Sequence, residues 1–179
     1  MNTLPISSLE TLNTVSNDAA QTWFLQTCAS EAWCHAMVEA RPFTSTVEIC
    51  KQASTVWQTM GKEDLLQAFS AHPMIGDIST LRAKYANTKA IAANEQSGTQ
   101  AATEDVLTRL QSFNQAYLNK HGFIFIICAT GLSAAAMLDA LMQRLPNDTE
   151  QEIAIAAKEQ LKITLLRISK ALSNTTLKG

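Results

Sequence analysis

Apolar side chains recur every three or four residues through most of this chain, a spacing that places them on one face of an α-helix. A clear run begins near residue 103, and a longer one covers residues 150–172. The apolar positions are Val106, Leu110, Phe113 and Tyr117 in the first run, and Ile153, Ala157, Leu161, Thr164, Ile168 and Leu172 in the second. Both patterns predict amphipathic helices that bury one face.

Serine and threonine residues stand directly before several further runs, and their side chains favour helix N-termini. Ser16 precedes a predicted helix over 19–28, and Ser30 precedes one that must end by Arg41, because Pro42 follows. Thr44 or Ser45 begins a helix to about residue 57, and residues 62–69 continue the pattern. Ser133 begins a helix that Pro146 ends, and Thr149 is the predicted cap of the long C-terminal helix.

Three segments depart from helical periodicity. Residues 71–79 contain Pro73 and Gly76, and residues 86–102 are polar and aperiodic. Residues 123–128 (FIFIIC) look like a strand, but a lone strand has no pairing partner, so we expect buried extended or helical backbone. The predicted fold class is all-α: a single compact domain over 1–179 with about seven to nine helices and an irregular active-site loop.

Composition narrows the functional classes. The chain is 46% hydrophobic and has a net charge of only −2, which disfavours disorder and argues against nucleic acid as a partner. Its longest apolar stretch, 123–129, is far shorter than the ~20 residues of a membrane span, and the N-terminus has no secretory pattern. Cys28, Cys34, Cys50 and Cys128 lack metal spacing, so we expect reduced thiols, no metal and a cytoplasmic location.

Few residues have the chemistry of a catalytic group. Of the three histidines, His35 and His121 favour structural roles, the latter as a cation at a helix end. His72 follows a helix and is held by Pro73, so an acid–base role and a structural role stay equally open. Composition favours a solvated loop carboxylate over a site residue for Glu95. Arg167 must reach solvent, pair with an acid or contact a ligand, and the acid partner is the favoured alternative.

Several short motifs nevertheless follow one another in a recognisable order. They are Leu12-Asn13, Arg41-Pro42-Phe43, His72-Pro73-x-Ile75-Gly76, Glu95-Gln96, Tyr117-x-x-Lys120-x-Gly122-Phe123-x-Phe125-Ile126-Ile127-Cys128-Ala129-x-Gly131, Arg144-Leu145, Glu152, Ala156, Glu159, Ile163 and Arg167. In this order the chain resembles the 2-oxo-4-hydroxy-4-carboxy-5-ureidoimidazoline (OHCU) decarboxylases of urate degradation. The resemblance covers nearly all of the chain.

The resemblance implies an all-helical, cofactor-free carboxy-lyase, usually a homodimer, that releases CO2 from a small ureidoimidazoline and forms (S)-allantoin. It assigns catalytic roles to His72 and Glu95 and implies no metal site. The substrate-binding positions that it implies are Pro73, Ala92, Gln96, Phe125, Ile126, Ile127, Cys128, Ala129 and Arg167. At Ala92 the family commonly has Ser, and Met74, His121 and Ile124 are further departures that leave the local contacts open.

The implied reaction suits these residues. The carbon that loses CO2 lies next to a carbon–nitrogen double bond, which takes up the electron pair, so the protein has to position groups and deliver one proton. Three other interpretations stay open: a helical binding module without turnover, a different enzyme on the same scaffold, and a purely structural role for His72 and Arg167. Loss of His72, Glu95 or Arg167 would favour the binding module, and all three are present.

Overall fold

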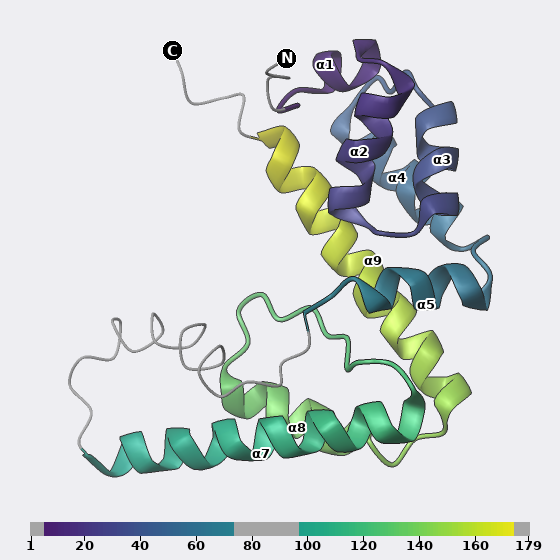
Figure 1. The fold of residues 1–179 in the computed structure, drawn as a ribbon. Coiled ribbons are helices and arrows are strands. Elements are labelled where there is room, and N and C mark those ends of the chain that lie inside the picture. Colours follow the sequence, from purple (N-terminus) through teal and green to yellow (C-terminus); the bar gives the residue numbers. More distant parts are fainter. Residues whose placement is uncertain (1–5, 74–96, 174–179) are drawn as a thin grey trace. The chain divides into compact units, whose positions relative to one another are not determined.

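The computed structural model describes residues 6–73 and 97–173, and for residues 97–103 the backbone alone. These ranges contain eight helices and no strand, which confirms the all-α prediction (Figure 1). The chain forms two compact units: Met1–Ala71 with Ala157–Gly179, and His72–Ala156. The single domain expected over 1–179 stays a prediction.

The first unit contains five short helices and the C-terminal part of a long one. These are α1 (Leu9–Thr14), α2 (Asn17–Thr27), α3 (Glu31–Glu39), α4 (Thr46–Trp57), α5 (Lys62–Ser70) and the residues of α9 (Thr149–Ser173) from 157 onward. The hydroxyls of Ser16, Ser30 and Ser45 each accept a hydrogen bond from the backbone N–H three residues later. The caps predicted from sequence are therefore confirmed for α2, α3 and α4.

Buried tryptophans join the helices of this unit. Trp33 is fully buried and its indole N–H donates to the Ala53 carbonyl at 3.1 Å, which connects α3 to α4. The Trp57 indole donates to the Ala157 carbonyl at 2.9 Å and connects α4 to α9. Each ring thus fills apolar volume while its polar N–H is satisfied.

Two polar residues of the N-terminal motifs have clear structural roles. The amide of Asn13 donates to the Phe43 carbonyl at 2.7 Å and accepts from the Phe43 N–H at 2.9 Å. The guanidinium of Arg41 donates to the carbonyls of Leu12 and Val15, at the C-terminal end of α1. These contacts fasten α1 to the segment before α4.

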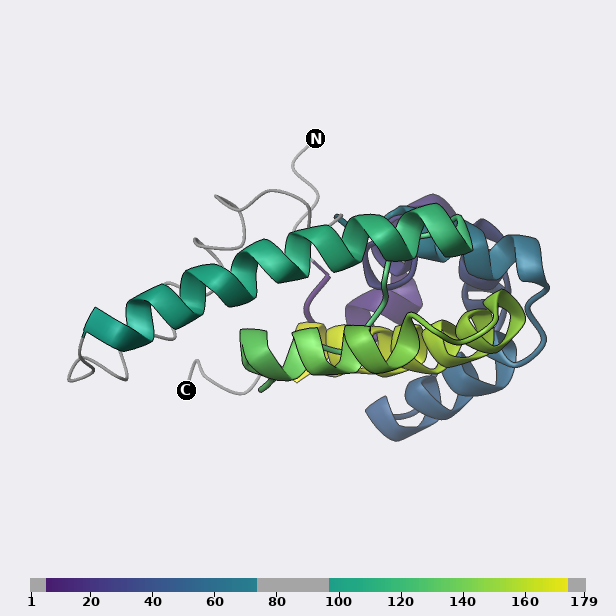
Figure 2. The same cartoon turned by 90° about the horizontal axis from the view of Figure 1, so that it is seen from below.

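The second unit is built on α7 (Ser97–His121) and α8 (Ala134–Arg144), which lie side by side in both views (Figure 2), together with the start of α9. Helix α7 begins six residues before the predicted start at Thr103, so the expectation that 97–102 is irregular was wrong. The N-cap of α8 is Ser133, as predicted. Asp148, and not Thr149, caps α9, because its carboxylate accepts from the Gln151 N–H at 2.8 Å.

In the described part of the chain, no helix has the length and apolar composition required to span a membrane.

Candidate functional site

The segment between α7 and α8 is irregular, and a glycine stands near each end of it. Residues 124–129 form neither helix nor strand, which corrects the helical alternative for this run. Gly122 and Gly131 both have φ of +78°, the left-handed region that side chains other than glycine rarely adopt. The Gly122 N–H donates to the Leu118 carbonyl at 2.9 Å and ends α7. The glycines therefore set the direction in which this loop leaves α7 and approaches α8.

The first half of the loop is fixed in the core of the unit. The rings of Phe123 and Phe125 meet the Tyr117 ring edge-on, with centroids 5.7 and 5.3 Å away. Phe125 and Ile126 are buried, whereas Ile127 and the two residues after it are only half-buried. Within the range 125–129 that is predicted to bind substrate, the first two residues are therefore packed in the core and the last three are partly accessible.

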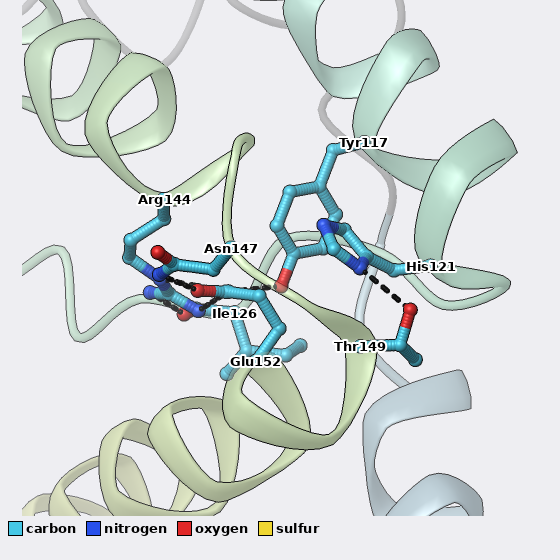
Figure 3. Close-up of polar contacts among 7 residues, drawn as sticks. All are labelled: Tyr117, His121, Ile126, Arg144, Asn147, Thr149 and Glu152. Atoms are coloured by element: carbon cyan, nitrogen blue, oxygen red, sulfur yellow. Dashed lines mark hydrogen bonds and ion pairs between the residues drawn. The ribbon is translucent and has the colours of Figure 1, made fainter.

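A buried carboxylate organises the polar groups beneath this loop (Figure 3). One oxygen of Glu152 accepts from the Tyr117 hydroxyl and from Nε and Nη2 of Arg144, at 2.9 and 2.8 Å from the two nitrogens. Its other oxygen accepts from the Asn147 amide at 2.8 Å. The Glu152 side chain is fully buried and that of Arg144 is 12% exposed. We call these four residues the Glu152 network.

The charges in this network are set by burial and by hydrogen bonds. Burial alone would raise the pKa of Glu152, but the hydrogen bonds from Arg144, Tyr117 and Asn147 outweigh it and hold this pKa below its usual value. Burial, together with the bond to Glu152, raises the pKa of Tyr117. At neutral pH the network therefore contains an ionised carboxylate and a phenol that keeps its proton.

His121 is buried beside this network. Its Nδ1 lies 3.0 Å from the Thr149 hydroxyl, and its Nε2 has no hydrogen-bond partner in the described ranges. Burial lowers the pKa of His121, as does the charge of Lys120, while the Glu152 carboxylate acts in the opposite direction. The neutral ring is thus favoured over the cation expected at this helix end. A structural role agrees with the packing of this ring against Tyr117.

Two of the predicted site residues follow α5. This helix ends at Ser70, and His72 lies in a bend with Pro73 after it, as the sequence indicated. His72 is half-buried and Pro73 is exposed. By contrast, the side chain of His35 is 70% exposed and lies 3.7 Å from Glu39, a pair on the surface of α3.

Arg167 belongs to the first unit, whereas His72, Pro73 and the loop residues 125–129 belong to the second. Its Nη1 donates to the Thr27 carbonyl at 3.3 Å, at the C-terminal end of α2, where a cation complements the helix dipole. Arg167 is exposed and forms no ion pair within 6–73 and 97–173. The acid partner that the sequence offered as one alternative for Arg167 is thus not found in those ranges.

The remaining predicted site residues, Ala92, Glu95 and Gln96, lie outside the described residues. Across the residues that are described, no cluster of three or more His, Cys, Asp or Glu has an arrangement that could hold a metal ion. None of the four cysteines, all of which lie within the described ranges, forms a disulfide bond.

The Glu152 network is not among the site features that the sequence predicts. A signal was present, because Glu152 stands beside Ile153 on the apolar face of its helix, and Tyr117 stands on the apolar face of α7. A carboxylate and a phenol on buried faces each require a polar partner. The pattern along the chain does not show that they are partners of each other.

Comparisons with known proteins agree on one family. The family profile described as OHCU decarboxylase matches residues 13–169. The Arabidopsis thaliana uric acid degradation bifunctional protein TTL is 38% identical over 150 residues, which are 82% of this chain and 45% of that protein. The Bacillus subtilis protein PucL, also described as a uric acid degradation bifunctional protein, is 22% identical over 129 residues, or 72% of this chain and 25% of its own length. The chain thus spans less than half of these curated relatives.

Solved structures show the same similarity. A crystal structure of OHCU decarboxylase in the presence of (S)-allantoin superposes with a TM-score of 0.68 at 34% identity, covering 86% of this chain and 98% of that one. A crystal structure of (S)-allantoin synthase superposes with a TM-score of 0.67, covering 92% of this chain and 53% of that one, but at 18% identity it supports the fold alone. Because the family profile covers most of its length, this chain belongs to the OHCU decarboxylase family.

Proposed function

We propose that this protein removes CO2 from OHCU without a cofactor and produces (S)-allantoin. One observation carries the proposal: the chain covers 98% of a solved OHCU decarboxylase at 34% identity, and that structure was determined in the presence of (S)-allantoin. The family match over residues 13–169 supports the same reaction class. The small-molecule substrate follows from this proposal.

The chemistry of the substrate assigns the protein a limited task. When the bond to the carboxylate breaks, its electron pair forms a new carbon–carbon double bond in the ring, and the pair of the carbon–nitrogen double bond moves onto nitrogen. The ring nitrogen takes up a proton, the hydroxyl on the carbon that lost CO2 gives up its proton and becomes a carbonyl, and a proton is added to one face of the neighbouring ring carbon, which carries the ureido arm. The protein has to hold the ring, stabilise the charge and control that face.

We assign the acid–base role to His72 and a supporting role to Glu95. An imidazole beside a rigid Pro73 is suited to exchanging a proton with the substrate hydroxyl near neutral pH. Glu95 would orient this imidazole or accept from a ring N–H. Gln96, which donates and accepts, would bind the ureido arm, and Ala92 and Pro73 would border the substrate.

Arg167 is proposed to bind a carbonyl or ureido oxygen, or to orient the carboxylate loosely. A tight clamp on the departing carboxylate would stabilise the ground state more than the transition state and would slow the reaction. In the described ranges, its one hydrogen bond is the contact at 3.3 Å with the Thr27 carbonyl. Its other N–H donors thus stay available for substrate.

The backbone of residues 125–129 is proposed to bind the ring. In this part of the protein, Phe125 and Ile126 are buried while Ile127, Cys128 and Ala129 are half-buried. A main-chain donor held in such a place is preorganised and costs little reorganisation during the reaction.

We further propose a cytoplasmic homodimer. The dimer rests on the family resemblance, and the location rests on the four cysteines, none of which forms a disulfide, the state that reducing compartments preserve. Sedimentation of the purified protein tests the dimer, and a single monomeric species at micromolar concentration would contradict it.

The experiment supplies freshly generated OHCU and follows circular dichroism, because a chiral product gives a signal that spontaneous decay to a racemate does not. His72→Asn should lower kcat/KM by about 10²- to 10⁴-fold, the usual contribution of a general acid or base. His35→Asn is the matched control, since His35 is 70% exposed on α3, and it should keep wild-type activity. A His72→Asn protein with most of its activity would remove His72 from the mechanism.

A further inference from the structure

The peptide between Ile126 and Ile127 is held from one side. Nη1 of Arg144 donates to the Ile126 carbonyl at 2.8 Å (Figure 3), and the peptide is trans. In a planar trans peptide the carbonyl and the following N–H point in opposite directions. Fixing the Ile126 carbonyl towards Arg144 therefore aims the Ile127 N–H away from Arg144.

That N–H is in a position to serve a ligand. Ile127 is half-buried, and within 6–73 and 97–173 its N–H donates to no protein acceptor. A backbone donor that is partly withdrawn from solvent is normally satisfied by protein, water or a bound molecule. The neighbouring Ile126 carbonyl already accepts a hydrogen bond from Arg144, so the Ile127 N–H is the group of this peptide that can bind a ligand.

The guanidinium that holds this peptide is itself held in place. Nε and Nη2 of Arg144 donate to a single oxygen of Glu152, and the guanidinium carbon lies 4.4 Å from the centre of the Phe125 ring. Glu152 is fixed in turn by Tyr117 and Asn147. The orientation of the peptide is thus determined by side chains of α7, α8, α9 and the segment between α8 and α9.

A stabilising role alone does not account for this arrangement. Removing two charges from water costs about as much as their mutual attraction returns, and apolar residues of similar volume often stabilise a fold equally well. A buried Arg144–Glu152 pair is therefore weak support for stability as its purpose. What this pair does beyond stability is to fix the orientation of the Ile126 carbonyl.

We propose that Arg144 is a positioning residue that aims the Ile127 N–H at the ring carbonyl oxygen of the substrate. The inference rests on the proposed function. In OHCU the ring carbonyl adjoins the nitrogen that receives the electron pair when CO2 leaves, so its oxygen shares the developing negative charge. A donor fixed at this oxygen binds the transition state more strongly than the substrate and acts on kcat.

The test measures kcat and KM separately for Arg144→Lys, with folding followed by far-UV circular dichroism. Lysine keeps the charge but cannot hold both Glu152 and the Ile126 carbonyl in the fork geometry of a guanidinium. We expect kcat to fall by about 10- to 100-fold, the usual cost of losing a group that orients another, with KM changed by less than about threefold. Arg109→Lys is the control, because Arg109 contacts Met142 on the exposed side of α7 and α8, and its kcat should not change.

Tyr117→Phe provides a second test if Arg144→Lys does not fold. It keeps the ring against which Phe123 and Phe125 pack and removes only the hydroxyl that donates to Glu152. We expect a fall in kcat of about 3- to 10-fold, smaller because Arg144 still pairs with Glu152. A folded variant of either kind with wild-type kcat overturns the inference, as does an effect confined to KM. Failure of the wild-type protein to form (S)-allantoin refutes the proposed function, a distinct result.

Discussion

Replacing Glu152 by alanine should destabilise the fold strongly. The carboxylate is fully buried and accepts four hydrogen bonds, two of them from Arg144. Its removal leaves the Arg144 guanidinium, only 12% exposed, without a counter-charge. Loss of one partner of a buried ion pair typically costs about 3–5 kcal/mol in free energy of unfolding. For a chain of this size that corresponds to a fall in Tm of about 6–20 °C.

A double variant separates the effect of losing the ion pair on stability from the effect of losing side-chain volume. Glu152→Leu with Arg144→Leu removes both charges together and should lose less stability than Glu152→Ala, because no unpaired charge stays buried. Urea unfolding at pH 7, followed by circular dichroism, gives the free energies of unfolding of Glu152→Ala and of the leucine cycle, which consists of wild type, Glu152→Leu, Arg144→Leu and the double variant. Additive losses across this cycle, or a loss below about 1 kcal/mol for Glu152→Ala, would refute the reasoning.

Two further predictions concern stability. Because the folded-state pKa of Glu152 is held below its usual value of 4.5, its contribution is complete above that pH and is lost as the pH falls through the folded-state pKa. Glu152→Gln should therefore flatten the loss of unfolding free energy in urea between neutral and acidic pH, and an unchanged pH profile would contradict this. Asn13→Ala removes both hydrogen bonds to the Phe43 backbone and should cost about 1–3 kcal/mol in urea unfolding. A cost below about 0.5 kcal/mol would show that water replaces them.

The positions of most helices could be predicted because their signals are local. A serine that caps a helix stands only three residues before the backbone N–H that donates to its hydroxyl, so it can be recognised in the sequence. Ser16, Ser30, Ser45 and Ser133 all accept such a hydrogen bond. The start of α7 at Ser97 could not be predicted, since residues 97–102 have no apolar stripe. Once the later turns are packed, adding further residues to a helix costs little, so it extends beyond its apolar stripe.

The Glu152 network could not be predicted for a different reason. Tyr117, Arg144 and Glu152 are up to 35 residues apart, and their partnership depends on how α7, α8 and α9 pack. A sequence pattern shows that a buried acid needs a partner but not which residue supplies it. The same limit applies to Arg167, whose contact is a backbone carbonyl at the end of α2, a type of acceptor that every residue carries.

The central claim is tested most directly by the optical activity of the product that the wild-type protein forms from fresh OHCU. We expect a circular dichroism signal of (S)-allantoin that rises in proportion to the amount of protein and well ahead of spontaneous decay. A product without optical activity, formed at the rate seen in buffer alone, would contradict it.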